Sequence, residues 1–391
     1  MATPTITVEI AFASAPLAVT QVWANVTDYV DAIWLRRGRQ TELARVEAGR
    51  LRLTLDNADG RFSPLNTQSP YYPNVIPSRR VRVSATWNSV TYRLFTGFID
   101  AWPPEWGGGL LGTVEISATD AFKRFTKSKL TTTRSQETVT ARITGVLTTL
   151  GWNPAEASIA TSQSFIQSGA WTQQTALSIF LEAAETENGA FFINGAGVAT
   201  FQNRYHRLTN TRSTTSQATF GDGTSELPYQ QVQLLYDDLN IYNDVQITRT
   251  GGTTQIASDA ASQVKYFVGS YTRTLPILTD NEANDAANWI LYTSKEADIR
   301  ARALTVSGYD DDALWPHVLG LEISDLVTVR KRPPGSSDTI DRSTYIESVE
   351  HTIGLDSSWT TTYQLSPASA GSWFVLDDPT RGRLDFNALA Y

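Results

Sequence analysis

The sequence predicts a mainly β protein with an α+β insert, in which two similar antiparallel β-barrel domains flank a smaller helix-plus-hairpin domain. Three observations support this fold class: alternating apolar segments near both ends, helical periodicity in the middle, and an internal similarity between the two β-rich parts. With 391 residues the chain is long enough for two or three domains, each with its own core.

Residues 1–130 are predicted to form the first barrel. Five segments place apolar or β-branched side chains at every second position, as half-buried strands do, and turn signals such as Asp59-Gly60 and Pro103-Pro104 separate them. The segments are 6–12, 50–55, 80–87, 92–99 and 112–120.

Residues 131–230 are predicted to form the small α+β domain. Between Ile143 and Leu150, apolar residues recur at i, i+3, i+4 and i+7, the spacing of one helix face. A second helix is expected within 172–189, and two apolar segments around Asn194-Gly195 predict a hairpin.

Residues 231–368 are predicted to form the second barrel, with strands that resume near Asn240 and one helix. That helix should begin at Thr279, because Glu282 follows at the spacing of a capping box. The last residues, 369–391, are expected to be a tail that docks on another surface.

The internal similarity relates residues 80–120 to residues 325–367. Each has a Val-x-Val pair, then a tyrosine (Tyr92 or Tyr345) followed by an isoleucine, a tryptophan-bearing turn and an alternating closing strand. A duplicated barrel is the favoured interpretation, and chance similarity between two β-meanders is the alternative.

Composition excludes several classes of function. The net charge is -8, so the whole molecule should not seek nucleic acid or an anionic membrane. Without cysteine there are no disulfides, zinc–thiolate sites or thiol nucleophiles. The first basic residue is Arg36, so no secretory signal is expected, and no apolar run approaches the ~18 residues of a membrane span.

The loop from Asp56 to Gly60 raises the question of a calcium site. With Gly60 at position 6 of an EF-hand loop, Leu55 and Asn66 would fall at positions 1 and 12, where neither supplies the required ligand. Asp and Asn before a glycine are typical of a turn, which is the prediction.

No metal, catalytic or cofactor-binding residue is predicted. Three adjacent aspartates, Asp310 to Asp312, are expected to be solvated, with cation binding left open. His206, His317 and His351 are too scattered to form a local ligand pair. There is no nucleophile elbow or phosphate-binding loop, although the two carboxylates of a glycosidase would leave no local signature.

Tryptophans and basic clusters are the remaining candidates for binding. Turn-associated tryptophans could bind sugars or partners, but we favour rings that cap the barrel ends. Clusters of arginine and lysine suit contacts between subunits better than nucleic acid. The tryptophans are Trp102, Trp106, Trp315 and Trp359, and the clusters are 35–39, 78–82 and 329–334.

Four segments carry a resemblance to a known family. Residues 37–87 and 92–103 resemble the N-terminal barrel of minor tail proteins of siphophages that infect actinobacteria, and residues 343–367 and 373–391 resemble their C-terminal ends. The architecture is similar to the tail hub (baseplate hub) proteins of tailed phages.

The resemblance implies a non-enzymatic structural protein of the virion, assembled in the host cytoplasm and placed at the distal end of the tail. It implies a homotrimeric ring that joins the sixfold tail tube and the distal tail protein ring to threefold fibre or spike proteins. The tape measure protein is a further implied partner, and genomic DNA would pass through the lumen without specific binding. Two alternatives stay open: a hexameric distal tail protein with a carbohydrate-binding C-terminal domain, and a tail-associated glycan-cleaving enzyme.

Overall fold

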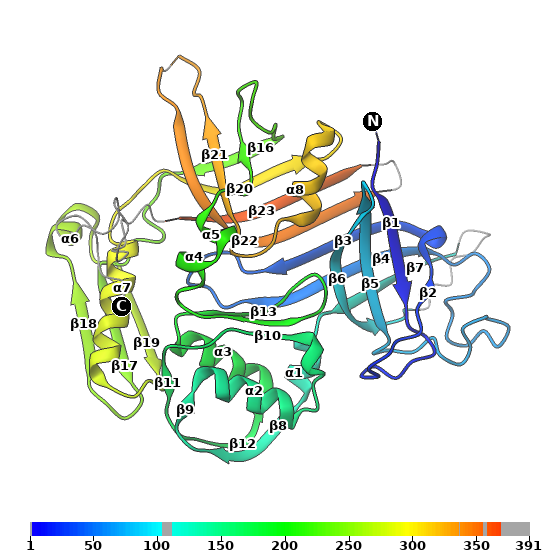
Figure 1. Ribbon diagram of the computed structural model, residues 1–391, viewed down its shortest axis with the longest axis horizontal. Coiled ribbons are helices and arrows are strands. Elements are labelled where there is room, and N and C mark those ends of the chain that lie inside the picture. The colour runs from blue at the N-terminus through cyan, green and yellow to red at the C-terminus, as the bar shows by residue number, and fades with distance from the viewer. Residues whose placement is uncertain (1, 104–111, 336, 355–357, 369–391) are drawn as a thin grey trace.

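The computed structural model describes residues 2–103, 112–335, 337–354 and 358–368. Its largest element is a sheet of 13 strands built from both ends of the chain (Figure 1). The predicted tail, 369–391, lies outside the described residues. The strands of this sheet are β1 (Thr5–Ile10), β2 (Ala24–Asn25), β3 (Val30–Gly38), β4 (Glu47–Asp56), β5 (Arg80–Trp87), β6 (Val90–Ala101), β7 (Thr113–Thr119), β15 (Thr219–Phe220), β16 (Gln231–Leu235), β20 (Arg300–Ser307), β21 (Leu326–Lys331), β22 (Ile340–Gly354) and β23 (Trp359–Pro367).

The duplication that the sequence suggests is present as a repeated order of antiparallel strands. The first module has the order β3-β4-β7-β6-β5, and the second module has the order β16-β20-β23-β22-β21. Strand alternation explains the layers, since Leu51, Leu53 and Leu55 of β4 are buried while Arg50 and Arg52, which alternate with them, are exposed.

The sequence predicts two separate barrels, but the two modules do not form them. They share one sheet, because β22 of the second module pairs with β3 of the first. Among the described strands the order runs from β16 at one end to β2 at the other, so the sheet does not close on itself. The strand period predicts that these segments are strands, but the choice of partner depends on contacts more than 300 residues apart, as between Arg39 and Glu347.

The repeat extends to a β-bulge at the same place in each module. The extra residue is Asp100, directly after Ile99 in β6, and Glu347, directly after Ile346 in β22. The sequence comparison aligns Tyr92 with Tyr345, whereas the strand register puts Phe98 in the place of Tyr345.

A hydroxyl on the neighbouring strand contacts each bulge carboxylate. Thr119 donates to Asp100 at 2.7 Å, and Ser366 donates to Glu347 at 2.5 Å. The two hydroxyls occupy the same register position, opposite Phe98 and Tyr345 respectively. Chance similarity between two meanders does not account for a shared bulge, carboxylate and hydroxyl.

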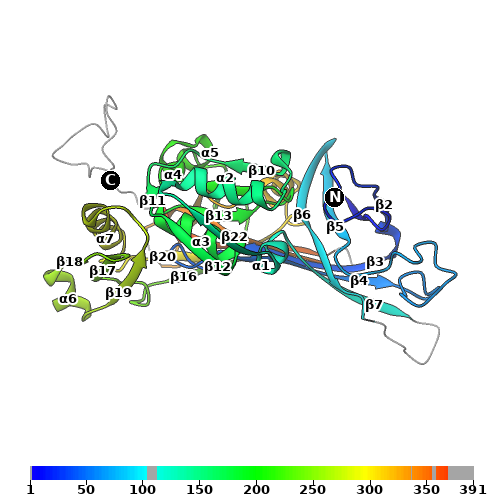
Figure 2. The same cartoon turned by 90° about the horizontal axis from the view of Figure 1, so that it is seen from below.

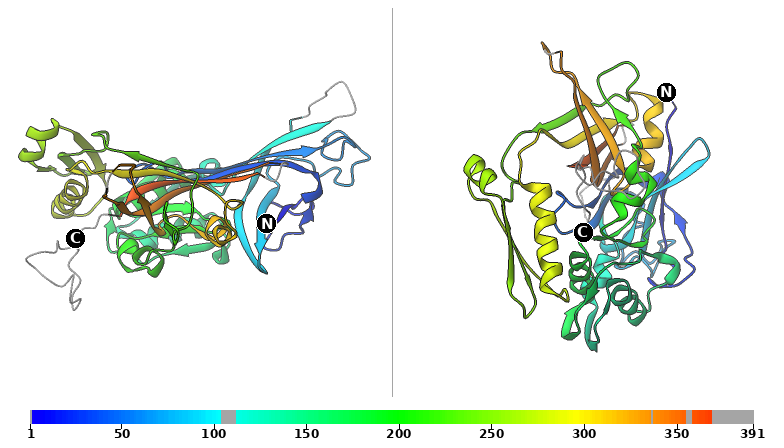
Figure 3. Two further views of the ribbon diagram at one scale, coloured as in Figure 1. Left: turned by 90° about the horizontal axis from the view of Figure 1, so that it is seen from above. Right: turned by 60° about the vertical axis from the view of Figure 1, so that its left-hand side comes forward.

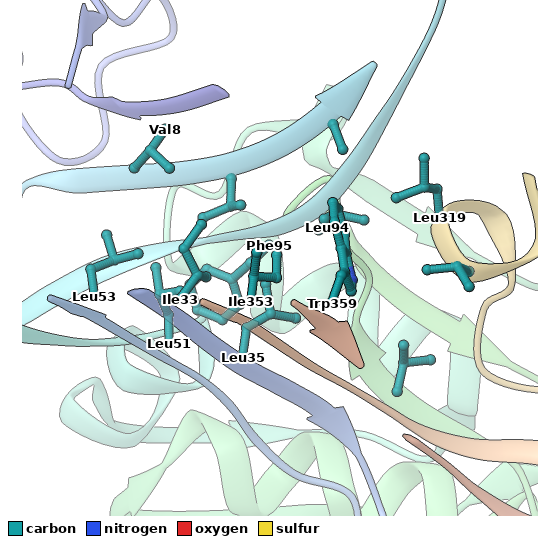
Figure 4. Packing of buried hydrophobic residues seen from close by; sticks show 14 of the residues in the cluster. Val8, Ile33, Leu35, Leu51, Leu53, Leu94, Phe95, Leu319, Ile353 and Trp359 are labelled. Atoms are coloured by element: carbon teal, nitrogen blue, oxygen red, sulfur yellow. The ribbon is translucent and has the colours of Figure 1, made fainter. Parts of the chain in front are cut away.

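One hydrophobic core joins both modules. Val8, Leu35, Leu94 and Ile353 belong to it, although they come from distant parts of the chain (Figure 4). Such a shared core explains why the two modules form a single body.

Three of the four tryptophans considered above are buried. Trp102, Trp315 and Trp359 have exposed fractions of 6%, 0% and 2%, and the rings of Trp315 and Trp359 meet at 5.2 Å. They belong to the core of the sheet rather than to the ends of barrels, and their burial leaves no exposed indole for sugar binding; Trp106 lies outside the described residues.

The insert covers one face of the main sheet (Figures 2 and 3). The predicted helices are α2 (Val139–Thr149) and α3 (Ala176–Thr186), and the predicted hairpin at Asn194 joins β13 (Ala190–Ile193) to β14 (Ala199–Gln202). Its own core contains Phe125, Phe180 and Phe191. The other elements here are α1 (Phe122–Lys127), β8 (Lys129–Arg134), β9 (Glu137–Thr138), η2 (Pro154–Glu156), β10 (Ala157–Ile159), β11 (Phe165–Ile166), β12 (Gly169–Thr175), α4 (His206–Thr209) and α5 (Thr211–Thr214).

Residues 236–299 form an α/β unit of their own, placed between β16 and β20. The sequence predicts that these strands belong to the second barrel, but they make a separate three-stranded sheet beside α7 (Figure 1). A third hydrophobic cluster lies between this sheet and α7. The capping box of α7 is present, with Glu282 accepting from the Thr279 N–H. The unit comprises β17 (Asp244–Arg249), β18 (Thr254–Ser258), α6 (Ala260–Tyr266), β19 (Ser270–Leu275) and α7 (Asp280–Ser294).

Short helices complete the described chain: η1 (Thr27–Tyr29), η3 (Asp312–Leu314) and α8 (Trp315–Gly320). No helix in the described ranges has the length and apolar character needed to span a membrane.

Trp315 should be among the most sensitive core positions. Its ring packs so closely on Gly308 that a Cβ there would lie 2.4 Å from the ring. We expect Trp315→Ala to lower the free energy of unfolding by about 3–5 kcal/mol, because it leaves a large cavity. Trp315→Phe, which keeps a ring and removes a buried N–H that has no partner among the described residues, should cost less. Chemical denaturation measures both; equal stability of Trp315→Ala and wild type would contradict the assignment.

Candidate assembly interface

The loop from Asp56 to Gly60 is a turn, as predicted. Asp56 accepts from the Ala58 N–H at 2.9 Å, Asp59 accepts from the Arg61 N–H at 3.0 Å, and Gly60 has a φ of 71°. These are the local bonds and the left-handed backbone that such turns require.

The other candidates for chemistry do not converge. Asp310 to Asp312 are exposed, and Asp311 caps η3 by accepting from the Ala313 N–H. His206, His317 and His351 lie in α4, α8 and β22. Within the described ranges, no group of three or more His, Asp or Glu side chains could hold a metal ion.

Basic side chains of the three clusters form ion pairs with acidic residues of the same chain. Arg80 pairs with Glu156 at 2.7 Å, and Arg82 forms a bidentate pair with Glu9. The remaining pairs include Arg37–Glu322, Arg39–Glu347, Arg330–Asp341, Lys331–Asp222 and Arg332–Glu226. The prediction that these clusters serve contacts between subunits therefore needs correction.

A cavity of about 140 Å³ lies where the β3–β4 connection, the second module, the insert and the α/β unit meet. Its cationic lining is already neutralised, since Arg45 pairs with Glu185 at 2.5 Å and Arg207 with Glu347 at 2.7 Å. The cavity is thus a junction between parts of the chain that internal ion pairs hold together.

The pairing of β3 with β22 is the contact that joins the two modules. It runs in antiparallel register from Gly38 opposite Ser348 to Ala32 opposite Gly354. At Gly38 the φ is +109°, and a Cβ there would lie 2.2 Å from the Glu347 carbonyl oxygen. Only glycine fits this approach.

Glu347 is the buried charge at this junction. Its side chain is fully buried, and it accepts from Arg39 at 2.7 Å and from Ser366. Burial alone would raise the pKa of Glu347, but the guanidiniums of Arg207 and Arg39 and the Ser366 hydroxyl outweigh it and hold the pKa at about 2.

Asp100 occupies the equivalent place in the first module and is less enclosed. Its side chain is 33% exposed and pairs with Lys123 at 2.8 Å. One contact between modules is thus made at Glu347. At Asp100, the equivalent place, none of the described residues of the second module covers the carboxylate.

A second buried link ties β3 and β4 to the rest of the chain. The Arg37 guanidinium donates to the Leu94 carbonyl at 2.9 Å and to Glu322 at 2.7 Å. Next to it, Asp120 accepts from the Gly49 N–H, and burial raises the pKa of Asp120 to about 7.

The outer edge of β16 is the feature that sequence reasoning missed. β16 stands in the second module where β3 stands in the first, since Val232 opposite Leu304 corresponds to Ile33 opposite Leu53. The edge of β3 is covered by β22, whereas among the described strands β16 pairs only with β20. An uncovered edge of this kind is a template for pairing with another chain.

Known proteins resemble this chain in structure but not in sequence. No protein-family model and no curated protein sequence matches the chain. The 43 kDa tail protein of prophage MuSo2 from Shewanella oneidensis is similar over 93% of this chain and 97% of that one, with 13% identity and a TM-score of 0.59. A tail protein from Neisseria meningitidis is similar over 93% and 96%, with 10% identity and a TM-score of 0.60.

The chain has the fold of phage tail proteins. A related likeness, with 8% identity and a TM-score of 0.51, is to an Escherichia coli component of the type VI secretion system; it covers 88% of this chain and 74% of that one. That protein is described as similar in structure to tail proteins of bacteriophage T4. The fold is therefore shared by phage tails and by a secretion machine.

Glu347→Gln should destabilise the junction. The variant leaves Arg39 and Arg207 without their carboxylate, which costs about 3–5 kcal/mol for a buried pair. Because the folded-state pKa lies below the ordinary value, the stabilisation is present above pH ~4.5 and is lost as the pH falls toward 2. The difference in unfolding free energy between wild type and variant should therefore shrink from pH 5 to pH 2.

Asp341→Asn, which removes a partner of Arg330 at an exposed pair, is the matched control and should leave the free energy of unfolding nearly unchanged. A Glu347→Gln variant as stable as this control at pH 7 would contradict the role assigned to the carboxylate.

Proposed function

We propose that the chain is the hub protein of a siphophage tail tip, of the kind found in phages of actinobacteria. In this role it is a structural protein without enzymatic activity. Three copies form a ring at the distal end of the tail, between the sixfold tail tube with the distal tail protein ring and the threefold fibre or spike proteins. The shared fold with tail proteins supports a place in the tail.

The observation that carries the proposal is the repeated module. The outer edge of β3 is paired within the chain, and the equivalent edge of β16 has no partner among the described strands. Within the chain, β3 of the first module pairs with β22 of the second. The equivalent pairing between copies would begin at Ala101, the last residue of β6, which stands where Ser348 stands in β22, and would join it to β16 of the neighbouring chain. Repetition of one heterologous contact closes a ring when the rotation allows it.

Three copies bring six similar modules to the ring, so a trimer of this chain can match a sixfold tube. The tape measure protein would lie on the tube side, and genomic DNA would pass through the lumen. The net charge of -8 favours passage of DNA without specific binding. The hexameric alternative calls for one β domain followed by an unrelated one, and the repeated strand order supports the hub instead.

The number of subunits per particle tests the proposal. Mass photometry and electron microscopy of the purified full chain should give a ring of three copies. A ring of six would support the distal tail protein, and a monomer that cleaves a polysaccharide would overturn the structural role altogether.

Proline at the β16 edge should separate assembly from folding. The N–H groups of neighbouring residues in a strand point to opposite edges of that strand. One of the two variants Gln231→Pro and Val232→Pro therefore removes a backbone hydrogen bond to β20, and the other removes an N–H group on the outer edge. We expect one variant to lose stability and the other to keep the wild-type melting temperature but remain monomeric. If the well-folded variant still forms trimers, the β16 edge is not the contact.

A further inference from the structure

The β3–β4 connection, which follows Gly38, covers the region of the second module next to the bulge carboxylate Glu347. Directly after β3, the Arg39 N–H donates to the Glu347 carbonyl at 2.9 Å. Residues Glu42 to Ala44 continue along the second module, where they line the same cavity as Tyr345. The β3–β4 connection of one module thus lies against the bulge region of the next.

In the second module the equivalent connection is the α/β unit, which begins at Tyr236. Its first residues leave β16 at the same end as Arg39 leaves β3. Two of them are exposed apolar side chains, Tyr236 at 69% and Leu239 at 72%. Between them Asp238 is exposed, and Asp237 lies 3.7 Å from Arg300.

The first module has an open groove at the equivalent bulge. It measures about 410 Å³ and lies beside Phe98, which stands in the place of Tyr345. Pro16 and Leu17 give it an apolar wall, with Leu17 42% exposed, and Lys123, Arg124 and Lys127 give it a basic lining. Lys123 is also the partner of the bulge carboxylate Asp100.

We propose that residues 236–239 of one copy dock into this groove of a second copy. Tyr236 and Leu239 contact the wall formed by Pro16 and Leu17, and Asp238 faces Lys127. The inference rests on the proposed ring and names the surface through which neighbouring copies recognise each other.

Three features favour a second copy over a different partner. The chain already makes the equivalent contact once, between the residues after β3 and the bulge at Glu347. The groove and the segment match in character, since an acidic segment with two apolar side chains meets a basic groove with an apolar wall. Residues 236–239 directly follow β16, and the groove lies beside β6, so both surfaces adjoin the strands that would pair in the proposed ring.

Cysteine cross-linking tests the contact directly, because the chain has no cysteine of its own. The full chain with Leu239→Cys and Leu17→Cys, treated with a short bismaleimide, should give covalent dimers and trimers on a denaturing gel. The control pairs Leu17→Cys with Thr254→Cys, an exposed residue beyond the hairpin at the other end of β17, and should give none. Absence of cross-links at Leu239 in particles that are trimeric would overturn the docking while leaving the ring intact.

A charge exchange supplies an independent readout. Asp238→Lys and Lys127→Glu should each raise the concentration at which half of the trimer dissociates by about tenfold, which corresponds to a loss of about 0.9 kcal/mol at each of the three contacts. The double variant should restore most of the wild-type value, which a merely local effect on folding would not do. Additive losses in the double variant would contradict the pairing, and a wild-type chain that never forms trimers would refute the proposed function itself.

Discussion

The antiparallel pairing of β3 with β22 is the contact on which the arrangement of the whole chain depends. It is possible because Gly38 has no side chain where the Glu347 backbone approaches, and because Arg39 and Arg207 neutralise the carboxylate buried there. The extra residue at the bulge, Glu347, interrupts the regular ladder between β22 and β23, and the donors around its carboxylate help to fix where the neighbouring strand lies. The junction therefore fixes register as well as position.

The first module carries the same bulge, but its carboxylate is only partly covered. Asp100 has a threonine hydroxyl and Lys123, where Glu347 has a serine hydroxyl and two arginines. The contrast follows from the position of each module in the chain, because among the described residues the bulge at Glu347 meets a neighbouring module and the bulge at Asp100 does not. A repeated module whose contacts are satisfied on one side only is suited to association with further copies.

Much of the local structure could be predicted from the sequence, because it depends on local periodicity. The helix around Ile143, the capping box at Thr279 and the turn at Gly60 each follow from spacing and residue type. The repeat can also be recognised in the sequence, but the sequence predicts the wrong register between its two copies. Tyr92 and Tyr345 look equivalent in the sequence, whereas only the bulges show that Phe98 is the true counterpart of Tyr345.

Other features could not be predicted, because they depend on distant partners. The strands after Asn240 have the alternation of any half-buried strand, and nothing in them indicates that they form a sheet of their own under α7. Likewise, the arginines of residues 35–39 gave no sign that Glu322 and Glu347, some 300 residues away, would pair with them. The unused edge of β16 becomes apparent only when the two modules are compared strand by strand.

The central claim is that the chain uses one kind of module contact twice, once within itself and once between copies. A cryo-electron microscopy map of the assembled particle, at a resolution that separates strands, tests this most directly. The account predicts a continuous sheet in which β16 pairs in antiparallel fashion with the neighbouring copy on the side of β6, as β3 pairs with β22. A ring whose copies touch through other surfaces, with the β16 edge facing solvent, would contradict it.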